Sequence, residues 1–84
     1  MQLTLFTDYA LRTLTYLALQ PDDRLSTITE VATKFGISRN HVVKIVHQLG
    51  VKGYIDTVRG KHGGIRLARL SQEINLKDVV SDME

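Results

Sequence analysis

The residues with the clearest chemical potential form two basic groups in the second half of this 84-residue sequence. The first group contains seven polar side chains at helical spacing: Ser38, Arg39, Asn40, His41, Lys44, His47 and Gln48. Arginine can donate two hydrogen bonds to guanine, asparagine or glutamine can pair with adenine, and serine or lysine can bind phosphate. We therefore predict a helix that reads duplex DNA with Arg39 at its leading tip; the alternative is an ordinary solvated helix face.

The second group combines glycine with positive charge: Arg59, Gly60, Lys61, His62, Gly63, Gly64 and Arg66. Glycines let a backbone approach phosphate or enter a minor groove, and the cations add attraction to the phosphates. A nucleotide-phosphate loop is the rival interpretation. The stretch lacks the spacing of that motif and leads into a predicted strand, whereas a phosphate loop opens a helix. We expect a loop that contacts DNA.

The charge distribution agrees with a polyanion binder. Residues 34–69 carry eight lysines and arginines against one aspartate, whereas the rest of the chain carries three against eight acids. The net charge of +2 hides this separation. A basic segment within a balanced chain is typical of nucleic-acid binding.

Several other classes of site are excluded or disfavoured. The chain contains no cysteine, so it cannot build a disulfide or a thiolate metal site alone. His41 and His47 lie off the spacing that brings two metal ligands together on a helix, and His62 lies on the predicted loop, so we expect no metal site. No nucleophile elbow or carboxylate pair stands out, and we do not expect an enzyme.

The N-terminus has no basic start, and no apolar run approaches the ~18 residues of a membrane span. We therefore expect a soluble, intracellular protein without a membrane partner.

A helix-turn-helix unit over residues 28–50 is expected to position the first group. Thr27 and Glu30 predict a capping box, in which each side chain accepts a hydrogen bond from the other residue's amide. Gly36 supplies a left-handed stop, and Ser38 caps the next helix. That helix is expected to carry a core stripe and to end at two glycines: Val42, Val43, Ile45, Val46 and Leu49, then Gly50 and Gly53.

The remaining elements complete the predicted fold. A first helix capped by Thr7 or Asp8 runs to about Leu19, and Asn75 opens a last helix that runs to Glu84. Two alternating stretches around the glycine-rich loop predict a β-hairpin, or wing, over residues 54–68. The fold class is thus mainly α with a small β-hairpin, a winged helix-turn-helix, and residues 1–84 form a single domain.

Three stretches of the sequence resemble a known family: residues 3–12, 38–45 and 58–67. They are similar to the Rrf2 family of iron–sulfur transcription regulators, and Phe6-Thr7-Asp8-Tyr9 is typical of its nitric-oxide-sensing branch. The resemblance implies a homodimeric repressor in the bacterial cytoplasm. Such a repressor binds a palindromic operator, controls nitrosative-stress genes and releases DNA when nitric oxide damages its cluster.

The sequence departs from the family because members continue into a cysteine-bearing loop and a long dimerisation helix. We therefore expect no iron–sulfur cluster in this chain alone, and a weak homodimer or pairing with a full-length relative. The resemblance implies that the Asp8 carboxylate reaches the partner's cluster as an oxygen ligand; the simpler interpretation is a helix cap. A cluster-less short paralogue, a dominant-negative partner and a winged-helix protein-interaction module remain alternatives.

Overall fold

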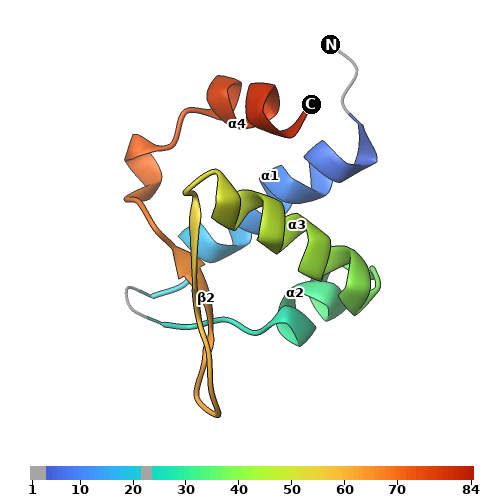
Figure 1. The fold of residues 1–84 in the computed structure, drawn as a ribbon, viewed down its shortest axis with the longest axis vertical. Coiled ribbons are helices and arrows are strands. Elements are labelled where there is room, and N and C mark those ends of the chain that lie inside the picture. The colour runs from blue at the N-terminus through green and yellow to red at the C-terminus, as the bar shows by residue number, and fades with distance from the viewer. Residues whose placement is uncertain (1–3, 22–23) are drawn as a thin grey trace.

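The computed structural model describes residues 4–21 and 24–84, and within them the chain forms four α-helices, one 3-10 turn and one antiparallel hairpin. In chain order these are α1 Leu5–Ala18, α2 Ile28–Phe35, α3 Arg39–Val51, β1 Ile55–Val58, β2 Gly64–Leu67, the 3-10 turn Ser71–Glu73 and α4 Leu76–Met83. Figure 1 shows α3 in the middle of the molecule and the hairpin projecting away from α4. The expected fold class, mainly helical with a small hairpin wing, is confirmed.

The first helix begins earlier than the sequence predicted. Its N-cap is Thr4, whose hydroxyl accepts a hydrogen bond from the Thr7 amide at 3.1 Å. The prediction of Thr7 or Asp8 as the cap was wrong, because Thr7 is already buried within the first helical turn and Asp8 follows it there. The helix ends at Ala18, next to the predicted Leu19.

The core lies between the four helices and the base of the hairpin. Side chains from all of these elements are buried: Ala10, Leu14 and Leu17 from α1, Val31 and Ala32 from α2, Val42, Ile45 and Leu49 from α3, Ile65 from β2, and Val79 from α4. Helix α1 packs against α3, α4 and β2, so it is the common support of the other elements.

The predicted caps of α2 and α3 and the left-handed stop between these helices are confirmed. Thr27 caps α2 by accepting from the Glu30 amide at 3.0 Å, and Gly36 ends α2 with a φ of 66°. Ser38 then caps α3 by accepting from the His41 amide at 3.1 Å. The Glu30 carboxylate, which was predicted to accept from the Thr27 amide, accepts hydrogen bonds from the Arg24 and Tyr16 side chains.

Two details of α3 correct the predictions. Gly50 does not end the helix; α3 continues to Val51, and Gly53, with a φ of 82°, makes the turn after it. Val43 is not in the core, because half of its surface is exposed. It therefore lies on the outer face of α3.

The hairpin is extended by a third segment that the sequence did not predict. Strands β1 and β2 pair with Ile55 opposite Leu67 and Val58 opposite Gly64. Ser26 adds an antiparallel bridge to Ile65 through backbone hydrogen bonds of 2.9 and 2.7 Å. This bridge joins the segment just before α2 to the wing.

The last helix, α4, is capped by Asn75 as predicted, and it ends at Met83, one residue before the predicted end. The buried Tyr54 hydroxyl donates a hydrogen bond to Asp82 at 2.6 Å, and Arg69 lies over the Tyr54 ring. Burial, reinforced by that bond, raises the pKa of Tyr54 to about 12. These contacts fix the base of the hairpin against α4. None of the helices in the described part of the chain is long and apolar enough to cross a membrane.

Candidate nucleic-acid interface

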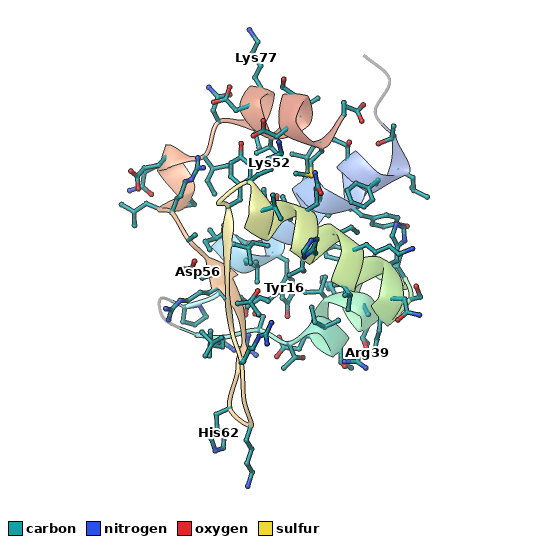
Figure 2. All side chains as sticks on the ribbon, viewed as in Figure 1. Tyr16, Arg39, Lys52, Asp56, His62 and Lys77 are labelled. Carbon is teal, nitrogen blue, oxygen red and sulfur yellow. The ribbon has the colours of Figure 1, made fainter. Side chains whose placement is uncertain are left out.

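A groove of about 550 Å³ lies between the outer face of α3 and the hairpin. It brings together residues from both predicted groups: Arg39 and His47 from α3, and Arg59, Gly60, Gly63 and Gly64 from the hairpin. Figure 2 shows Arg39 and His62 toward the same end of the molecule, with Lys77 at the opposite end. Part of each basic group thus lines the same groove.

The outer face of α3 carries most of the predicted reading residues. Arg39, Asn40, Lys44 and His47 are exposed, whereas Gln48 is half-buried. Arg39, Val43 and His47 follow one another four residues apart and line the groove. This arrangement leaves the N-terminal half of α3 free to approach a flat or grooved surface.

Two predicted residues have structural roles at the start of α3. The Ser38 hydroxyl caps the helix. The half-buried His41 ring lies 5.6 Å from the Tyr9 ring in an edge-on arrangement and 6.3 Å from the Phe6 ring. His41 therefore packs against α1, a contact that neighbouring residues do not indicate because its partners lie more than thirty residues away.

The hairpin residues divide into two sets. Arg59 lines the groove, and Lys61 and His62 are exposed at the tip. Arg66 lies opposite Asp56 in the strand register and lines a different hollow, together with Gln20. The structure does not bring Arg66 into the groove.

The hairpin glycines are required by the fold itself. A Cβ atom at Gly63 would lie 2.1 Å from the Val58 carbonyl oxygen, and one at Gly64 would lie 2.5 Å from that of Ser26. Gly60 has a φ of 112°, which side chains rarely allow. The fold therefore accounts for these glycines by itself, and their approach to phosphate stays a prediction.

An ion-pair network outside the groove ties the supporting elements together. Arg24 donates hydrogen bonds to both Glu30 carboxylate oxygens, at 3.0 and 3.1 Å, and Tyr16 donates a third at 3.0 Å. The contact with Arg24 lowers the pKa of Glu30, whereas the bond to Glu30 raises the pKa of Tyr16. The charged form of Glu30 is thus the one that the fold stabilises.

The residues present do not fit an iron–sulfur cluster. The chain has no cysteine, and the residues that the structure describes contain no group of three potential metal ligands. Asp8 forms an ion pair with Arg12 at 3.2 Å on the surface of α1. A single carboxylate oxygen cannot hold a cluster whose ligands are normally thiolates.

Several residues that line the groove were not predicted from the sequence as site residues. Val43 and Val58 are both partly exposed there, and Thr27 and Ile28 contribute from the start of α2. In the structure Val43 lies between Arg39 and His47 at the four-residue spacing of one helix face, so all three line the groove.

Comparison with known proteins gives one family. The family model for Rrf2, described as an iron-dependent transcriptional regulator, matches residues 3–84. Over all 84 residues the chain is 54% identical to the HTH-type transcriptional regulator NsrR of Halalkalibacterium halodurans and covers 58% of it. The chain therefore spans less than two thirds of the length of this curated relative.

Solved structures share the fold over the whole chain. CymR (YrzC), the global cysteine regulator of B. subtilis, superposes with a TM-score of 0.93 at 20% identity, and the match covers 65% of it. The oxidized form of Staphylococcus aureus CymR superposes with a TM-score of 0.91 at 25% identity, and the match covers 68% of it.

Proposed function

The chain belongs to the Rrf2 family of transcriptional regulators, and on that premise we propose that residues 1–84 act as one winged helix-turn-helix domain that binds duplex DNA. In this proposal α3 enters the major groove with its N-terminus first, and the hairpin contacts the neighbouring backbone or minor groove. The groove between α3 and the hairpin carries the proposal. Cations from both elements line it, and none of the described residues in its lining is acidic.

Individual roles follow from the positions of the side chains. Arg39, at the start of α3, and Asn40 read base edges, and Lys44 and His47 contact bases or phosphates farther along the helix. Ser38, His41 and Gln48 support this face more than they read DNA, because two of them are partly buried and Ser38 caps α3. Arg59, Lys61 and His62 contact phosphates from the hairpin.

The relationship to NsrR supports a more specific role. We propose a repressor that recognises a palindromic operator and controls genes of the response to nitric oxide. A palindrome needs two reading heads about one helical turn apart. The 84 residues are therefore proposed to act as a weak homodimer or to pair with a full-length relative. A cluster that senses nitric oxide would belong to such a relative, since this sequence has no thiolate.

The test uses the 84-residue chain and a random duplex library. Repeated selection should enrich one sequence, and an inverted repeat in it would support the palindromic operator. We expect Arg39→Ala or Asn40→Ala to weaken binding to the selected duplex by about 1–3 kcal/mol and to relax its base preference.

Lys77→Ala is the matched control, because Lys77 is also exposed but lies at the far end of the molecule from Arg39. Binding of the Lys77→Ala variant should equal that of the wild type. Failure to enrich any duplex, or equal binding by wild type and both α3 variants, would contradict the DNA-reading role and favour a protein-interaction module.

A further inference from the structure

An apolar side chain lies where a DNA-reading helix would be expected to carry polar ones. Val43 is 50% exposed, and Arg39 and His47 flank it one helical turn away on each side. Across the groove lies Val58, which is 37% exposed. Valine has a lower helix propensity than alanine or leucine, and its side chain offers no hydrogen bond, so helix formation does not explain its place on this face.

The chemistry of the major groove suggests a partner for such a side chain. Base edges there present hydrogen-bond donors and acceptors, and the apolar group among them is the C5-methyl of thymine. The apolar patch is also surrounded by positive charge, from Arg39 on α3 and Arg59 on the hairpin. Positive charge, with no acidic residue among the described residues of the lining, favours a polyanion such as DNA as the partner.

We propose that Val43 is a specificity-determining residue that contacts the C5-methyl group of a thymine in the bound duplex. The inference rests on the proposed DNA-binding function and adds a base preference to it. Four residues of helix rise about 6 Å, and base pairs are about 3.4 Å apart. The thymine should therefore lie one or two base pairs from the base that Arg39 contacts.

The experiment removes the methyl group from the DNA and its partner from the protein. The probe is the duplex selected with the wild-type chain, in which each thymine is replaced in turn by uracil, which lacks only the C5-methyl. Loss of one buried methyl contact should weaken binding about fourfold. We expect this loss at one thymine, or at its symmetric pair in an inverted repeat.

The Val43→Ala variant makes the assignment specific. It should bind the thymine duplex about fourfold more weakly than the wild type and show no further loss with uracil at that position, because the two changes remove the same contact. Alanine is the better helix former, so this variant is expected to fold. Val51→Ala is the matched control, since Val51 is 65% exposed on α3 outside the groove.

The possible outcomes separate this inference from the proposed function. If the selected duplex has no methyl-sensitive thymine, or if Val43→Ala loses the same factor with uracil as the wild type does, Val43 does not read thymine and DNA binding stands. If no duplex is selected at all, the proposed function fails together with this inference.

Discussion

Neutralising the hairpin cations should change the salt dependence of DNA binding more than its sequence preference. The change is Arg59→Gln together with Lys61→Gln. Arg59 lines the groove beside α3, and Lys61 is exposed at the hairpin tip, so each is placed to contact one phosphate. Each phosphate contact contributes about 0.9 to the slope of log affinity against log salt concentration. The double variant should therefore lower the magnitude of the slope by about 1.8 units.

The structure also provides the matched control, Arg66→Gln in the same hairpin. Arg66 lies opposite Asp56 and outside the groove, so its removal should leave the slope unchanged. The assay is fluorescence anisotropy of a labelled duplex between about 50 and 200 mM salt, where the wild type should lose about twelvefold more affinity than the double variant. A slope that changes equally in the double variant and the Arg66→Gln control would refute this assignment of phosphate contacts.

Three further predictions concern the fold and the cofactor. Glu30→Gln should lower the free energy of unfolding at neutral pH by up to about 1 kcal/mol. Because the folded-state pKa of Glu30 is lowered, this contribution is present above about pH 4.3 and is lost as the pH falls through the folded-state value. Urea denaturation that gives the same difference in unfolding free energy between wild type and variant in acid as at neutral pH would contradict this prediction. Gly64→Ala should destabilise the fold by about 1–3 kcal/mol, because the added Cβ would meet the Ser26 carbonyl oxygen. Gly50→Ala should stabilise the fold by about 0.5–1 kcal/mol, because Gly50 lies within α3 and alanine is the better helix former. Thermal unfolding of both variants measures these changes. Anaerobic reconstitution of the 84-residue chain with iron and sulfide should leave no bound iron after desalting, because Asp8 alone cannot replace thiolates. Stoichiometric iron with a sulfide-to-iron absorption band would overturn this prediction.

Local signals in the sequence were sufficient for most helix boundaries. The caps at Thr27, Ser38 and Asn75 and the left-handed stop at Gly36 were predicted because each depends on residues within about three positions. The cap of the first helix was predicted at the wrong residue because the role of Thr7 depends on a distant contact. Thr4 and Thr7 both offer a hydroxyl, and only the structure shows that the Thr7 hydroxyl turns inward and donates to the Glu84 carboxylate at 2.7 Å.

Contacts between distant parts of the chain could not be predicted. The packing of His41 against Phe6 and Tyr9 depends on how α3 crosses α1, which local sequence does not specify. The exposure of Val43 is a different case. Four of the five residues 42–46 are valine or isoleucine, and periodicity within so short an apolar run does not show which of them points outward.

The Ser26 bridge fixes the arrangement of the two halves of the proposed interface. Its backbone hydrogen bonds to Ile65 fix the wing to the segment that leads into α2, and Arg24 ties the Ser26 hydroxyl to Glu30 on α2. Helix α2 in turn packs against α3, so the position of the wing relative to the recognition helix is set within the folded chain. In the proposed complex a DNA duplex contacts both elements at once. Since their arrangement is fixed before binding, association does not have to order them, and more of the contact energy remains as affinity.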